Sequence, residues 1–81
     1  MIEKGKYRHY KGGEYKVIGV ALDTETKSPL VLYEACYEIP ELLAEYGDRP
    51  IFSRPYDMFV EIVTVDGKEL PRFQLIEKND E

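Results

Sequence analysis

The chain has 81 residues and a formal net charge of −5, and 43% of its residues are hydrophobic and 33% charged. A chain of this size buries only about 60% of the surface that it exposes when unfolded, so we expect a thin core and a shallow groove rather than a deep substrate cavity. No apolar run approaches the roughly 20 residues that span a bilayer, and the first five residues lack the apolar region of a signal peptide.

These features predict a single domain over residues 1–81. The single cysteine, Cys36, cannot form an internal disulfide, which favours a reducing compartment and predicts a cytoplasmic protein without membrane contact. Residues 3–16 carry a net charge of +3, so the rest of the chain carries −8. The overall acidity argues against non-specific DNA binding, whereas the basic N-terminal segment leaves a local contact with an anion or RNA open.

The first predicted hairpin joins a strand at residues 6–11 to a strand at 14–22 through the pair Gly12-Gly13. Glycine tolerates the positive φ of two-residue hairpin loops, and such a loop places Lys11 opposite Glu14 and Tyr10 opposite Tyr15. The predicted faces of this hairpin are Arg8, Tyr10, Tyr15 and Val17 on one side, and Tyr7, His9, Lys16 and Ile18 on the other.

After a polar loop at residues 23–29, the third strand is predicted at residues 30–39. Residues 40–47 begin with proline and end with glycine, which predicts one or two helical turns that cover an end of the barrel with Ile39, Leu43 and Tyr46. Strand alternation places Val31, Tyr33, Ala35 and Tyr37 on one face of the third strand, and Leu30, Leu32, Glu34 and Cys36 on the other.

The second half of the chain predicts a short strand that starts at Ile51 and enters a turn at Arg54-Pro55. Asp66-Gly67 is the strongest hairpin signal, Pro71 places the last strand at an edge or a bulge, and residues 77–81 are predicted to fray. The whole pattern predicts an all-β fold, a small SH3-like barrel of about five antiparallel strands with one short helical insert. An OB-like barrel is the alternative.

Groups that could perform catalysis are sparse. His9 is the only histidine, neither Ser28 nor Ser53 lies in a nucleophile motif, and Cys36 has the spacing of a small buried strand residue. The sequence has neither a phosphate-binding loop nor a second histidine at metal-ligand spacing. We therefore predict no catalytic residue, no metal and no cofactor.

Aromatic and cationic residues are more informative. Seven tyrosines suit a shallow groove for a base, a peptide or a methylated amine, although they could equally fill a thin core. Arg54, stiffened by Pro55, could bind a carboxylate or phosphate, or form a structural ion pair with Glu34 or Asp57. Glu34 itself interrupts an apolar strand and would pair with Arg8 or Arg54, or keep its carboxylate in water. The candidate ligand-binding residues are Arg8, His9, Tyr10, Tyr33, Tyr37 and Arg54.

The blocks "GKYRHYKGGEYKVIGVALDTET", "LVLYEACY", "SRPYDMF" and "VDGKELPRF" occur in this order and closely resemble the bacterial DUF1653 family of unknown function. The resemblance covers residues 5–73, which implies a domain core at 5–73 and a C-terminal tail at 74–81. It also implies a small SH3-type barrel, but it implies no activity. The segment at residues 38–50 departs from the resemblance, which implies a shorter turn there and a groove reshaped by the helical insert. The resemblance singles out Gly5, Tyr7, Arg8, His9, Tyr10, Lys11, Gly12, Tyr33, Tyr37, Arg54, Pro55, Met58, Phe59, Pro71, Arg72 and Phe73.

Three functions follow as hypotheses. The first is a non-catalytic binding module whose aromatic and cationic groove takes a small anionic ligand, a nucleotide or a peptide. The second is a small hydrolase with His9 as general base near Glu34. The third is a protein-interaction or oligomerisation module that uses the helical insert, in a chain that is a monomer or a weak homodimer.

Overall fold

The structure is a computed structural model that describes residues 2–79. Strands dominate it and every strand pair is antiparallel, so the all-β prediction is confirmed. Seven strands replace the five predicted ones. They are β1 (Gly5–His9), β2 (Glu14–Asp23), β3 (Ser28–Ala35), β4 (Ile51–Pro55), β5 (Ile62–Val65), β6 (Lys68–Pro71) and β7 (Phe73–Lys78).

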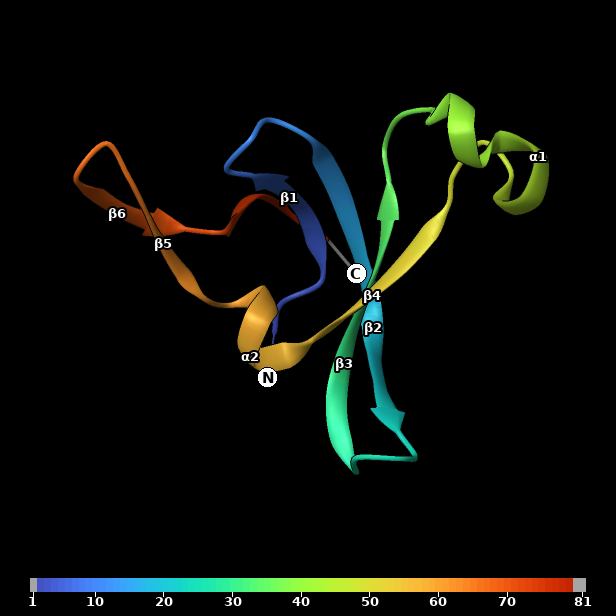
Figure 1. The fold of residues 1–81 in the computed structure, drawn as a ribbon, viewed down its shortest axis with the longest axis horizontal. Helices are drawn as coiled ribbons and strands as arrows, with labels where there is room; N and C mark the ends of the chain where they lie inside the picture. Colours follow the sequence, from blue (N-terminus) through green and yellow to red (C-terminus); the bar gives the residue numbers. More distant parts are fainter. Residues whose placement is uncertain (1, 80–81) are drawn as a thin grey trace.

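Five strands form one twisted sheet in the order β4-β3-β2-β1-β7, and β5 and β6 form a separate two-stranded ribbon (Figure 1). Within residues 2–79 the edge strands β4 and β7 do not pair with each other, so the SH3-like barrel is not closed. The ribbon lies to one side of the sheet instead of completing it. The helical insert lies at the other end of the molecule (Figure 1). Among the described residues, no helix is long and apolar enough to cross a membrane.

The first hairpin forms, but its predicted register is wrong by three residues. Arg8 lies opposite Glu14, and Tyr7 lies opposite Tyr15, so the connection is a five-residue loop instead of a glycine pair. The amide of His9 donates to the carbonyl of Gly13, and the amide of Gly12 donates to the carbonyl of His9, each at 2.7 Å. This register buries the ring of Tyr7 on the inner face of the sheet and leaves Arg8 on the outer face.

The third strand alternates as predicted, with Val31, Tyr33 and Ala35 buried on the inner face. The strand ends at Ala35, four residues earlier than predicted, and the insert follows as a 3-10 turn at Pro40–Leu42 and the helix α1 at Leu43–Tyr46. Gly47 terminates this helix with a φ of 80°. The helix buries none of its residues, so the prediction that the insert covers an end of the barrel with Ile39, Leu43 and Tyr46 is wrong for Leu43 and Tyr46.

A second helix, α2 at Tyr56–Phe59, follows β4 where the sequence predicted only a turn. Its last residue, Phe59, is 1% exposed and stacks on Phe73 with ring centroids 4.1 Å apart and nearly parallel planes. The predicted Asp66-Gly67 hairpin is confirmed, with both residues at positive φ between β5 and β6. The core consists of Tyr7, Val17, Val31, Tyr33, Phe59 and Phe73.

The last strand is longer than the sequence indicated. β7 continues to Lys78 and pairs with β1, where Lys6 lies opposite Glu77 and Gly5 opposite Lys78. Residues 74–78, which we predicted as part of a tail, therefore belong to the sheet. This pairing places Phe73 at the end of the sheet, directly opposite His9.

Candidate functional site

Phe73 is the centre of the candidate site. The His9 ring packs edge-on against it, with ring centroids 4.8 Å apart, and the guanidinium carbon of Arg54 lies 5.5 Å from the Phe73 centroid. His9 ends β1, Phe73 begins β7, and Arg54 lies on β4 at the opposite edge of the sheet. The curl of the open sheet therefore brings side chains from its two edges to one ring.

His9 is held in a defined orientation. Its Nδ1 atom accepts a hydrogen bond from the Lys11 amide at 3.1 Å, and its ring packs on Tyr10 at 4.7 Å between centroids. In the neutral imidazole this bond leaves the proton on Nε2, which is then free to donate. Burial lowers the pKa of His9, and the positive charges of Arg54, Arg72 and Lys11 lower it further, so the neutral form prevails at pH 7.

Arg54 reaches the site because of strand register. It lies opposite Val31 in the β3–β4 pair, which places its side chain on the inner face of the sheet. Its Nε atom donates to the hydroxyl of Tyr33 at 3.2 Å, while its terminal nitrogens form no ion pair within residues 2–79. A half-buried guanidinium thus keeps two terminal nitrogens available for an acceptor.

Arg72 adds a third group, which the family resemblance singles out but which was not among the candidate ligand-binding residues. Its Nη2 atom bonds to Oε1 of Glu61 at 2.8 Å, and its backbone amide donates to the Glu61 carbonyl at 2.9 Å. Its Nε atom is buried and has no hydrogen-bond partner among residues 2–79. The sequence signal was its position in the "LPRF" block, but only the β1–β7 pairing brings that block next to His9.

The electrostatic character of this cluster is positive. The positive charges of Arg54, Arg72 and Lys11 all lower the pKa of His9. Glu61 neutralises part of the Arg72 charge. Because its Nδ1 atom accepts from Lys11, His9 offers a donor at Nε2, and both arginines carry only donors, so the group that would satisfy them is an acceptor with negative charge.

The two predicted tyrosines have different environments. Tyr33 is 5% exposed, and its hydroxyl accepts the hydrogen bond from Arg54. This buried hydroxyl therefore orients the Arg54 side chain. Tyr37 is exposed, and its hydroxyl shares a 2.7 Å hydrogen bond with that of Tyr15, whose ring contacts Phe73 at 5.9 Å. Burial raises the pKa of Tyr15, and the bond with Tyr37 raises it further. Tyr37 also lines a separate surface hollow of about 470 Å³ with Gly12, Gly13, Glu14 and Cys36.

Arg8 and Glu34 lie on the other face of the sheet. Arg8 forms an ion pair with Glu14, with Nη2 and Oε2 3.0 Å apart. Glu34 lies opposite the exposed Lys16 on the outer face and forms no ion pair within residues 2–79. The structure therefore brings together His9, Tyr10, Tyr33 and Arg54 of the predicted residues, and separates Arg8 from them.

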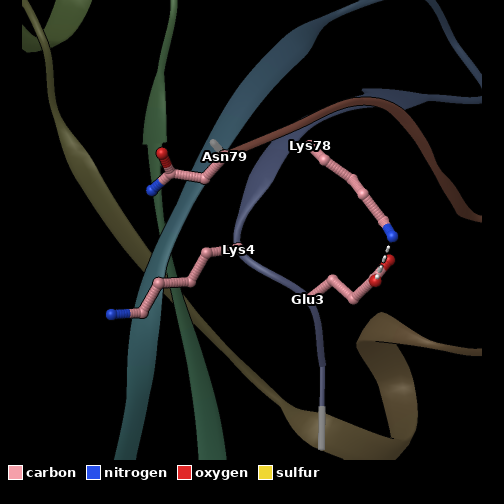
Figure 2. Close-up of a pocket in the computed structure, with 4 residues that line it drawn as sticks. All are labelled: Glu3, Lys4, Lys78 and Asn79. Atoms are coloured by element: carbon pink, nitrogen blue, oxygen red, sulfur yellow. Dashed lines mark ion pairs between the residues drawn. The ribbon is translucent and has the colours of Figure 1, made fainter. Parts of the chain in front are cut away.

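A second surface hollow, of about 500 Å³, lies between the first residues of the chain and the end of β7 (Figure 2). Glu3 and Lys78 form an ion pair of 3.1 Å on one side of it, and Lys4 points away from that pair. Glu3 and Lys78 neutralise each other, and both side chains are exposed. We therefore propose no ligand for this hollow. Residues 2–79 contain no group of three His, Cys, Asp or Glu side chains that could hold a metal ion.

Comparisons with known proteins agree with this fold. A family model described as "Protein of unknown function (DUF1653)" matches residues 5–75. A crystal structure of a DUF1653 protein from Bordetella bronchiseptica is similar, with 29% identity and a TM-score of 0.80, over 99% of this chain and 94% of that one. No curated protein matches the chain.

Proposed function

The chain belongs to the DUF1653 family, whose function is unknown, and we propose that it is a non-catalytic binding module for a small anionic ligand. The proposed site comprises His9 and Arg54, which pack on the Phe73 ring, and Arg72, whose charge acts on His9. The observation that carries the proposal is that His9 and Arg54 both pack on the Phe73 ring, while the charge of Arg72, which is paired with Glu61, acts on His9. A phosphate or carboxylate group, free or on a nucleotide or an acidic peptide, has the matching chemistry.

The hydrolase hypothesis has less support. A histidine that acts as a general base needs a partner that stabilises its protonated form, and the charges near His9 all oppose protonation. Glu34, the carboxylate proposed for that role, lies on the outer face of the sheet. The low pKa suits His9 as a neutral Nε2 donor instead. The cytoplasmic location stays a prediction.

The test is a titration with inorganic phosphate and with adenosine monophosphate, in which binding is monitored by the NMR chemical shifts of amide and aromatic groups. We expect shifts at residues 9–12, 54 and 72–73, with weak affinity. Arg54→Gln removes a charge-assisted hydrogen bond of about 1.5–3 kcal/mol, so it should weaken binding about 10- to 100-fold.

Arg8→Gln is the matched control, because it removes the same charge from the outer face. It should change the affinity less than about two-fold, since an exposed distant charge is screened. Thermal unfolding of both variants verifies that they are folded. The proposal is wrong if both ligands leave the spectra unchanged at tens of millimolar, or if the two variants weaken binding equally.

A further inference from the structure

Strand β4 is a free edge of the five-stranded sheet. The amide of Ala35 donates to the carbonyl of Pro50 at 3.0 Å, and hydrogen-bonded pairs alternate along an antiparallel ladder. With the β3–β4 register, Phe52 and Arg54 then bond to β3. The amide and carbonyl groups of Ile51 and Ser53 consequently point outwards, where another strand could pair with them.

An apolar hollow of about 350 Å³ adjoins this edge. Leu42 and Tyr46 from the helical insert line one side, and residues 50–53 line the other. Tyr46 is 61% exposed and Ile51 is 57% exposed, so both side chains are accessible to a partner. An open row of backbone groups beside apolar side chains is the arrangement by which extended peptides add to a sheet.

The segment that supplies Leu42 and Tyr46 to this hollow is acidic, and we call residues 38–49 the acidic rim. Residues 38–49 contain Glu38, Glu41, Glu45 and Asp48 against Arg49, a net charge of −3. None of these four carboxylates forms an ion pair with residues 2–79. A second copy that paired β4 with β4 would bring two such rims together, and like charges would oppose that contact.

We propose that the β4 edge and this hollow are a docking site for an extended, positively charged segment of a partner protein. The segment would pair its backbone with Ile51 and Ser53, place an apolar side chain between Leu42 and Tyr46, and set basic side chains against Glu41 and Glu45. This surface involves neither Phe73 nor His9, and Arg54, although it lies on β4, bonds to β3 and turns its side chain to the inner face, so the proposal does not rest on the anion site.

The probe is a short synthetic peptide of alternating lysine and valine, which supplies an extended backbone, apolar side chains and positive charge. We expect it to shift the NMR signals of residues 42–46 and 51–53 and to slow hydrogen exchange at the Ile51 and Ser53 amides. The analogue with glutamate in place of lysine should bind at least about ten-fold more weakly, because it meets the same acidic rim. Added phosphate should leave the peptide affinity unchanged.

Tyr46→Ser should weaken peptide binding at least about five-fold. Leu22→Ser is the matched control, because Leu22 is an apolar side chain of similar exposure, 62%, near the far end of β2, and it should have no effect. The proposal is overturned if the glutamate peptide binds equally well, if the peptide shifts map to β7, or if both variants weaken binding alike. A stable dimer of the free chain that Ile51→Lys dissociates would also overturn it, since the edge would then belong to a second copy.

Discussion

At the scale of single residues, Gly5 is the position with least room for a side chain. It is buried with a φ of +149°, and a Cβ atom there would collide with the Glu77 carbonyl oxygen and lie 3.1 Å from the Lys78 Cα. Both atoms belong to backbone that is paired in the β1–β7 ladder, so neither can move easily. We expect Gly5→Ala to reduce the free energy of unfolding by about 2 kcal/mol or more, measured by urea denaturation.

Gly19→Ala is the control for this prediction. A Cβ at Gly19 meets no atom within 4 Å, and its φ lies outside the left-handed region. That substitution should change the unfolding free energy by less than about 1 kcal/mol. Equal effects of the two substitutions would contradict a collision with the β7 backbone as the cause, because loss of glycine flexibility alone would then explain both.

The residues of the candidate site were only partly predictable from sequence. His9, Tyr10 and Arg54 were selected by residue type, and the structure places His9 and Arg54 against Phe73 and Tyr10 against His9. Arg8 is on the other face because a three-residue change of register reverses which residues point inwards. Arg72 was singled out by the family resemblance but not as a ligand-binding residue, because its position next to His9 depends on the β1–β7 pairing, which no local pattern encodes.

At the scale of elements, the two hairpins differ in how far the local sequence determines their register. Asp66-Gly67 adopts positive φ at both residues and gives the predicted register, because the loop geometry itself requires those residues. Gly12-Gly13 offers similar local freedom, yet the loop extends from His9 to Gly13. There, burial of Tyr7 against the core outweighs the turn preference. Tertiary packing therefore sets the register of the first hairpin.

The two short helices should contribute very differently to stability. Phe59 of α2 is 1% exposed and contacts Tyr7, Tyr33 and Phe73, whereas Leu43 of α1 is 43% exposed. Phe59→Ala should cost about 3–5 kcal/mol in the free energy of unfolding, because it removes a buried ring and leaves a cavity. Leu43→Ala should cost less than about 1 kcal/mol. Urea denaturation of both variants measures this difference, and a larger loss for Leu43 would show that α1 packs on the core.

At the scale of the whole molecule, the sequence patterns predicted the strands but did not predict whether the sheet closes into a barrel. Alternation along each strand identifies its inner face, as it did for Val31 and Tyr33. Closure depends on whether the edges β4 and β7 exchange backbone hydrogen bonds, and single-strand patterns do not encode that pairing. Here α2 redirects the chain after β4, and Phe59 fills the space beside Phe73. The two edges meet through Arg54 and Phe73 side chains instead.

The tyrosines make the stability of the whole fold sensitive to alkaline pH. Burial raises the pKa of both Tyr7 and Tyr15, reinforced at Tyr7 by the charges of Glu3 and Tyr56, and at Tyr15 by the hydrogen bond with Tyr37. In the unfolded chain both side chains ionise near pH 10. The unfolded state therefore releases their protons first as the pH rises. Their contribution to the free energy of unfolding is complete below about pH 10 and is lost as the pH rises further.

We expect the contribution of these two tyrosines to leave the urea midpoint of unfolding of the wild-type chain constant up to about pH 10 and to lower it above that pH. Tyr15→Phe removes one of the two raised groups, so the fall should become shallower. Tyr46→Phe is the matched control, since that ring is exposed in the helical insert and should leave the slope unchanged. If both variants changed the slope equally, general charge repulsion in this acidic chain, and not the buried tyrosines, would govern its unfolding in alkali.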